Sequence, residues 1–203
     1  MEDEQWNWEK GKQKQIADDL QDANEDIDDQ CVRGTRRFRL QRLALDNNSF
    51  QGNVPTNLSH YSNLMYLDFI DNKLVGNIPA ELDSLQILGA LELGRNKLTG
   101  SVPHSIGNLT SLWAIILGVS DLLGQIPEEI SHLGNFEYLM LTDNNLIGKI
   151  PPGLFNISSI CKISVDHNQP HGRLPLDTTL PNLRALGFSF NWFTGPIPIS
   201  VEM

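Results

Sequence analysis

The sequence predicts an α/β solenoid: a right-handed superhelix of short coils, with a parallel β-sheet on its concave face and short second strands and 3₁₀ or helical turns on its outer side. Three observations predict it. Apolar residues recur every 24 residues from Leu40 onward, two of these apolar positions are two residues apart, and Asn, Gly and Pro recur at fixed places in the period. Such periods are typical of chains whose repeats bury their apolar faces only against neighbouring repeats.

The period divides residues 40–203 into seven predicted coils, numbered 1 to 7. They begin at Leu40, Leu64, Leu88, Leu112, Phe136, Ile160 and Leu183. Coils 1 to 5 have 24 residues each, whereas coil 6 has 23, and its deletion falls between Pro175 and Leu180. Because length changes are tolerated best in surface loops, this segment is predicted to be a loop.

Each coil opens on a predicted short strand. In coil 2 the apolar residues are Leu64, Leu67 and Phe69, and the same three positions are apolar in all seven coils. Residues two places apart in a strand point to the same face, so Leu67 and Phe69 are predicted to face the core.

A polar position follows each predicted strand, occupied by Asn48, Asn72, Asn96, Ser120, Asn144, Asn168 and Asn191. An amide side chain carries two donors and an acceptor, so it can bond the backbone of its own turn and of the neighbouring coil. Stacked coils are therefore expected to form an asparagine ladder. We expect a local weak point at Ser120, because its shorter hydroxyl cannot bridge in the same way.

Glycine and proline complete each coil. In coil 2 they are Gly76 and, after a branched apolar residue, Pro79. Glycine suits a bend with positive φ, and the residue before a proline is pushed toward extended geometry. Each coil is thus predicted to contain a second short extended segment. Apolar positions such as Leu82 and Leu85 then close the coil from its outer side as short 3₁₀ or helical turns.

Residues 1–39 do not fit the period. They are acidic and poor in apolar residues, so they are expected to be partly disordered or weakly helical. The net charge is -10 without a basic stripe, so nucleic acid is not an expected partner. The start resembles no signal peptide, and no apolar run is long enough to span a bilayer, so the chain as written is expected to be soluble. The two cysteines, Cys31 and Cys161, are expected to be free thiols.

Units such as LMYLDFIDNKLVGNIPAELDSLQI, residues 64–87, resemble the leucine-rich repeats of plant receptor-like serine/threonine kinase ectodomains, in particular those of the immune-type subfamily. The resemblance covers about residues 40–203 and implies a leucine-rich-repeat solenoid on the extracellular side of the plasma membrane. It implies a peptide or protein ligand, a co-receptor ectodomain as a partner, and a role in signalling or defence. The motifs of the kinase domain are absent from the chain, so no enzyme activity is expected.

The outward residues of the strands are expected to form a concave surface, where the resemblance places ligand binding. The candidate ligand-binding residues are Tyr66, Asp68, Glu92, Arg95, Tyr138, Asp143, Lys162, Asp166, His167 and Phe190. Aromatic side chains dominate binding hot spots, so the three aromatic candidates are plausible anchors. The histidines are scattered and no metal set is complete, so no catalytic site, metal or cofactor is expected. In a secreted relative, glycans would be attached at Asn47, Asn57, Asn108 and Asn156.

Three functions remain open from the sequence. The first is a ligand-binding piece of a receptor ectodomain. The second is a stand-alone inhibitor or decoy of the polygalacturonase-inhibitor type, and the third is a truncated fragment without function. The sequence stops within a coil and shows no C-terminal cap, which favours a fragment.

Overall fold

The computed structural model describes residues 39–174 and 180–197 of the chain. The acidic segment predicted at residues 1–39 therefore lies outside the described residues except for Arg39, and Cys31 lies outside them with it. Most of the segment in which the deletion was predicted, from Pro175 to Leu180, lies outside the described residues as well.

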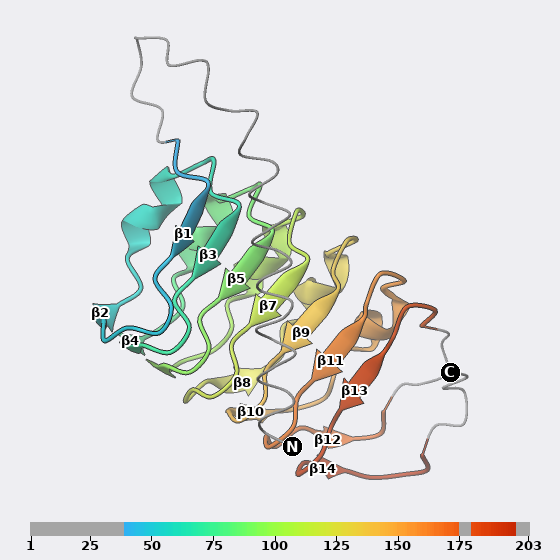
Figure 1. Ribbon diagram of the computed structural model, residues 1–203. Helices are drawn as coiled ribbons and strands as arrows, with labels where there is room; N and C mark the ends of the chain where they lie inside the picture. The colour runs from blue at the N-terminus through green and yellow to red at the C-terminus, as the bar shows by residue number, and fades with distance from the viewer. Residues whose placement is uncertain (1–38, 175–179, 198–203) are drawn as a thin grey trace. The chain divides into compact units, whose positions relative to one another are not determined.

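A parallel sheet of seven strands forms one side of the described coils, as predicted (Figure 1). The strands are β1 (Arg42–Ala44), β3 (Tyr66–Asp68), β5 (Ala90–Glu92), β7 (Ala114–Ile116), β9 (Tyr138–Met140), β11 (Lys162–Ser164) and β13 (Ala185–Gly187). They pair in the order of the sequence, so residues in register, such as Arg42 and Tyr66, come from neighbouring coils. Side chains alternate along each strand, and the central residue of β3, Leu67, is fully buried in the core.

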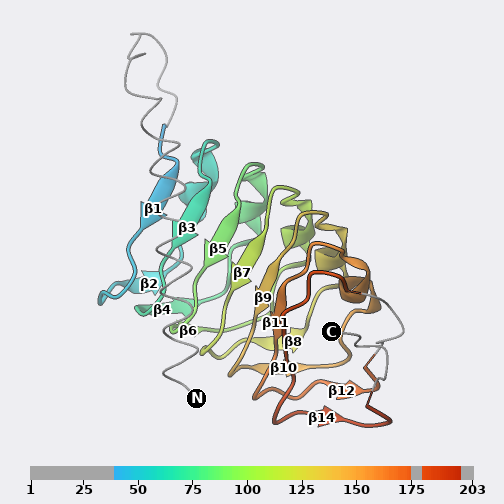
Figure 2. The ribbon, with the colours of Figure 1, turned by 45° about the vertical axis from the view of Figure 1, so that its right-hand side comes forward.

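A second short strand in each coil runs along another edge of the stack (Figure 2). These strands are β2 (Gln51–Asn53), β4 (Lys73–Gly76), β6 (Lys97–Leu98), β8 (Leu123–Gln125), β10 (Asn145–Ile147), β12 (His171–Gly172) and β14 (Trp192–Phe193). They form three small parallel sheets, β2-β4-β6, β8-β10 and β12-β14. The recurring glycine bends each of these segments. Gly76 has φ 77°, and a Cβ there would lie 2.6 Å from Oδ1 of Asn53.

The outer turns are 3₁₀ helices. They are η1 (Thr56–His60), η2 (Ala80–Ser84), η3 (His104–Asn108), η4 (Glu128–His132) and η5 (Pro152–Asn156). Each follows the recurring proline directly. In coil 2, Pro79 is extended with ψ 131°, and the N–H of Leu85 donates to the Leu82 carbonyl at 3.0 Å after the turn. Five residues in the tighter 3₁₀ geometry return the chain to the core, where Leu82 and Leu85 are buried.

The predicted asparagine ladder is confirmed. Asn72 Nδ2 donates to the Leu45 carbonyl of coil 1 at 2.9 Å and to the Phe69 carbonyl of its own coil at 3.1 Å. Its Oδ1 accepts from the Phe50 N–H at 2.9 Å, so one amide joins two coils. Equivalent bonds are made by Asn96, Asn144 and Asn168. The predicted break at Ser120 is also confirmed, because its Oγ is buried and has no hydrogen-bond partner in the described part of the chain.

The residue before each ladder position has a left-handed backbone, which the repeat pattern alone does not predict. The φ angles lie between 52° and 59° at Asn47, Asp71, Arg95, Val119, Asp143, His167 and Phe190. Asn and Asp tolerate this conformation, whereas a β-branched residue is a genuine outlier in it. Coil 4 therefore carries an unfavourable backbone at Val119 directly before the missing rung of the ladder.

Candidate functional site

The strand face is the side of the seven-stranded sheet that points away from the core. The parallel register arranges its side chains in two rows. The first row holds Arg42, Tyr66, Ala90, Ala114, Tyr138, Lys162 and Ala185. The second row holds Ala44, Asp68, Glu92, Ile116, Met140, Ser164 and Gly187. The structure thus brings five of the predicted ligand residues onto this face, in neighbouring rows.

The predicted residues on β3 and β5 are buried. Tyr66, Asp68 and Glu92 are 1%, 3% and 1% exposed. The hydroxyl of Tyr66 donates to Oδ2 of Asp68 at 3.4 Å, and the Ile70 N–H donates to Oδ1 of Asp68 at 2.9 Å. The Arg42 guanidinium lies 4.7 Å from the centre of the Tyr66 ring. Because Tyr66, Asp68 and Glu92 are buried, they present little surface to a ligand.

Burial controls the electrostatics of this group. It raises the pKa of the Asp68 carboxyl to about 6, and the negative charge of Asp46 adds to the rise. Burial also raises the pKa of the Tyr66 phenol, followed in importance by the charge of Glu92. Tyr66 therefore stays a neutral hydrogen-bond donor, and the charge of Asp68 depends on pH.

Tyr138 on β9 is also mostly buried, at 8% exposed, whereas Lys162 on β11 is partly exposed. The Trp113 ring, which precedes β7, meets Tyr138 edge to face with 6.2 Å between the ring centres. Trp113 lies over Gly89, where a Cβ would come within 2.6 Å of the indole Nε1. Trp113 was not among the predicted site residues, although a large aromatic at the position before the strand could have indicated it.

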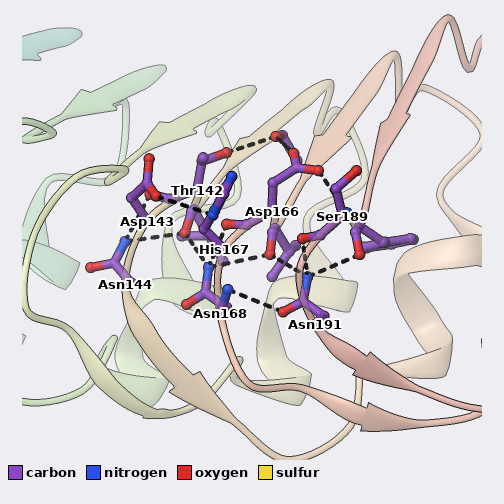
Figure 3. A network of polar contacts seen from close by, with 12 residues as sticks. Thr142, Asp143, Asn144, Asp166, His167, Asn168, Ser189 and Asn191 are labelled. Carbon is purple, nitrogen blue, oxygen red and sulfur yellow. Dashed lines mark hydrogen bonds and ion pairs between the residues drawn. The ribbon is translucent and has the colours of Figure 1, made fainter. Parts of the chain in front are cut away.

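Three of the remaining candidates occupy the left-handed position of successive coils and are exposed. They are Asp143, His167 and Phe190. The rings of His167 and Phe190 stack with their centres 4.3 Å apart and their planes 17° apart. Nδ1 of His167 lies 4.0 Å from Oδ1 of Asp143 (Figure 3). Consecutive coils thereby place a carboxylate, an imidazole and an aromatic ring in one line.

Asp166 holds a hydrogen-bond network beside this line (Figure 3). Its Oδ2 accepts from the Ser164 hydroxyl at 2.5 Å, and its Oδ1 accepts from the Ser189 N–H at 2.7 Å. The hydroxyls of Ser164 and Thr142 lie 2.7 Å apart. A Cβ at Gly187 would overlap the Asp166 carboxylate, so glycine at that position makes the arrangement possible. The Ser189 N–H is a partner that sequence reasoning missed, because it lies 23 residues away.

We call this set of residues the coil 5–7 ridge. It comprises Thr142, Asp143, Ser164, Asp166, His167, Ser189 and Phe190. Arg95 lies outside it: Arg95 occupies the left-handed position of coil 3, with its Nε 3.5 Å from Oδ2 of Asp71, and Val119 separates it from Asp143. The structure therefore gathers four of the ten predicted ligand residues, Asp143, Asp166, His167 and Phe190, into one set, in which Asp166 is half-buried and the other three are exposed. Tyr138 and Lys162 of the same coils lie on the strand face instead.

The chemistry of the coil 5–7 ridge suits recognition. Its carboxylates accept hydrogen bonds, its hydroxyls donate and accept them, and its two stacked rings offer an aromatic face. Among residues 39–174 and 180–197 no group of three or more His, Cys, Asp or Glu side chains is placed to hold a metal ion. The four glycosylation sequons place their asparagines on the surface: Asn57, Asn108 and Asn156 lie in 3₁₀ turns, and Asn47 follows β1.

The profile of the Leucine Rich Repeat family matches residues 88–109 and 135–157. No curated protein matches the chain. The leucine-rich-repeat ectodomain of the plant membrane receptor kinase GASSHO1/SCHENGEN3 from Arabidopsis thaliana, solved with CASPARIAN STRIP INTEGRITY FACTOR 2, is 36% identical with a TM-score of 0.74, and the match covers 76% of this chain and 19% of that chain.

A second ectodomain, that of the Arabidopsis receptor kinase HAESA with an extended IDA peptide hormone, is 31% identical with a TM-score of 0.73. That match covers 76% of this chain and 26% of that chain. A chain of the BIR3–SERK2 complex from Arabidopsis thaliana is 30% identical with a TM-score of 0.56, over 66% of this chain and 71% of that chain. The chain belongs to the leucine-rich-repeat family.

The leucine-rich repeats of this chain are similar to those of plant receptor-kinase ectodomains, which confirms the resemblance to that class of ectodomain; the immune-type subfamily stays a prediction. This leucine-rich-repeat chain spans only about a fifth to a quarter of the two larger ectodomains, 19% and 26%. In the part of the chain that the structure describes, no helix is both long and apolar enough to cross a membrane.

Proposed function

We propose that this chain is a ligand-binding leucine-rich-repeat module of a plant receptor kinase, and that its coil 5–7 ridge contacts a peptide ligand. The observation that carries the proposal is the ridge itself. Asp143, Asp166, His167 and Phe190 come from three successive coils; His167 contacts both Asp143 and Phe190, and all but the half-buried Asp166 are exposed. In this role the chain binds and does not catalyse.

The geometry of the ridge supports recognition of an extended peptide. Asp166 is fixed by bonds at both carboxylate oxygens, and the His167 ring is fixed by its stack on Phe190. Side chains that are held in place before binding lose little entropy when a ligand arrives. One solved relative was crystallised with a peptide hormone and another with CASPARIAN STRIP INTEGRITY FACTOR 2, which supports a peptide or protein ligand here.

A selection experiment with two variants of the coil 5–7 ridge tests the proposal. The purified chain is used to select binders from a phage-displayed library of random peptides. Phe190→Ala removes an aromatic side chain that is 75% exposed, and Asp143→Asn removes a charge while keeping a residue that tolerates the left-handed backbone. Each is expected to weaken the selected peptides at least about tenfold, as hot-spot residues do.

His132→Ala is the matched control, because His132 is exposed at the end of η4 in the outer turns. It should leave peptide affinity unchanged. Circular dichroism of all three variants checks that the fold is intact. If selection yields no binder, or if the binders tolerate both ridge variants as well as they tolerate the control, the ridge is not the binding site.

The same proposal assigns the chain to the extracellular side of the plasma membrane and residues 40–203 to seven repeats, with a co-receptor ectodomain as a second partner. The exposed asparagines Asn47, Asn57, Asn108 and Asn156 support glycosylation in that compartment. Expression of the parent gene product in plant cells, followed by enzymatic removal of N-glycans, should increase its gel mobility. An unchanged mobility would argue against secretion.

A further inference from the structure

Three hydrogen bonds recur around the asparagine ladder where two coils meet. Between coils 1 and 2, Asn72 Nδ2 donates to the Leu45 carbonyl at 2.9 Å, and the Phe50 N–H donates to Asn72 Oδ1 at 2.9 Å. The third joins the Asn48 N–H to the Asp71 carbonyl at 3.1 Å. The same three bonds form between coils 2 and 3, 4 and 5, and 5 and 6.

The junction between coils 3 and 4 has none of the three. Ser120 stands at the ladder position, so among the described residues no side-chain amide of coil 4 reaches back to the Leu93 carbonyl or accepts from the Leu98 N–H. The Leu93 carbonyl keeps only the bond from the Asn96 amide of its own coil, at 2.9 Å. The Asn96 N–H, within the described residues, makes no bond to the Val119 carbonyl. In the described part of the chain the Ser120 Oγ is buried without a partner, and Leu98 is fully buried. Buried polar groups without partners are costly, so this junction is weaker than its neighbours.

Two other sides of the same junction are intact. In the seven-stranded sheet, β5 and β7 lie side by side (Figure 1), and the Leu93 N–H donates to the Ile116 carbonyl at 2.8 Å. On the outer side, Nδ1 of His104 lies 2.8 Å from Oε2 of Glu129. The 3₁₀ turns also approach closely, because a Cβ at Gly107 would lie 2.6 Å from the Glu129 carbonyl oxygen. The weakness is thus confined to the ladder side.

We propose that the junction between coils 3 and 4 is an opening seam of the solenoid. The ladder side separates there in local unfolding, while the β5–β7 pairing and the contacts between η3 and η4 act as the hinge. Val119 adds to the effect, because a β-branched residue is disfavoured in the left-handed conformation that it holds beside the seam. Local opening of this kind is a sub-global motion that native-state hydrogen exchange measures.

Amide hydrogen exchange of the whole chain, followed by NMR, tests the seam. The decisive amide is Leu98, whose counterparts Leu74, Leu122 and Leu146 each donate to a ladder asparagine. Because Leu98 is fully buried, its exchange requires opening. It is expected to exchange at least about tenfold faster than these counterparts, since even one missing hydrogen bond changes an opening equilibrium by nearly that factor. The Asn96 amide should exchange with the same urea dependence, as a unit with Leu98.

Two reciprocal single substitutions test the seam, one that fills the missing rung and one that removes a rung elsewhere. Ser120→Asn supplies the missing rung and should slow the Leu98 amide to the rate of its counterparts. Asn144→Ser creates a second defect of the same kind one coil later and should make the Leu122 amide exchange fast as well. The proposal is overturned if the Leu98 amide of the natural chain is as protected as those of Leu74 and Leu146, or if Ser120→Asn leaves its exchange unchanged.

Discussion

Removing a ladder asparagine from the middle of the chain should destabilise the protein far more than removing the first one. Asn144 is only 8% exposed. Its Nδ2 donates to the carbonyls of Leu117 at 3.0 Å and Leu141 at 3.1 Å, and its Oδ1 accepts from the Leu122 N–H at 3.0 Å. Asn144→Ala therefore leaves buried backbone groups of two coils without partners.

The magnitude follows from those groups. Leu117 and Leu122 are fully buried, and a buried polar group that loses its partner costs about 1–3 kcal/mol. Two such groups give an expected loss of about 3 kcal/mol in the free energy of unfolding. For a chain of this length that corresponds to a fall of roughly 6–12 °C in Tm.

Asn48→Ala provides the matched control. Asn48 is exposed, and among the described residues its side chain bonds only two carbonyls of its own coil, those of Leu45 and Asp46. These carbonyls can turn to water when the amide is lost, so the expected cost is about 0.5–1 kcal/mol. Urea denaturation followed by circular dichroism measures both values. Equal losses for Asn144→Ala and Asn48→Ala would refute the reasoning that bridging between coils, rather than the local turn, makes the ladder stabilising.

Three further changes test the same structure by urea denaturation. Val119→Asn should raise the free energy of unfolding by about 1 kcal/mol, because asparagine accepts the left-handed backbone that costs a β-branched residue; no gain would mean that Val119 is unstrained. The raised pKa of Asp68, about 6, means that the folded chain binds its proton more tightly than the unfolded chain. Stability should therefore fall by up to about 3 kcal/mol as pH rises from about 4 to about 6, and Asp68→Asn should abolish that dependence. Gly94→Ala should cost about 1–3 kcal/mol, since its Cβ would lie 2.9 Å from the Gly118 carbonyl oxygen, whereas Gly134→Ala, which meets nothing within 4 Å, should be neutral.

The fold was predictable from the sequence because its determinants are local and periodic. Spacing of two within a strand, an amide after it, and glycine and proline at fixed intervals each constrain the backbone of one coil, and repetition every 24 residues implies stacking. The gap in the ladder was predictable for the same reason, since the reach of the Ser120 hydroxyl is a property of that residue alone.

The site was predictable only in part. The alternation of strand residues identified which side chains leave the core, but it treated all of them as accessible. Tyr66, Asp68 and Glu92 are buried instead. Their burial depends on the rotamers of residues in neighbouring coils, such as Arg42 over the Tyr66 ring, and periodicity carries no information about rotamers.

By itself, then, the sequence determined the coil: its length, its strands, its ladder and its one missing rung. The tertiary structure decided which residues from different coils meet. His167 stacks on Phe190 and Asp166 binds the Ser189 N–H because a parallel register brings residues 23 apart into contact. It also decided that Val119 takes a left-handed backbone. That φ angle recurs at the same position in the turn after the first strand of every coil, so the turn imposes it and the preference of valine does not.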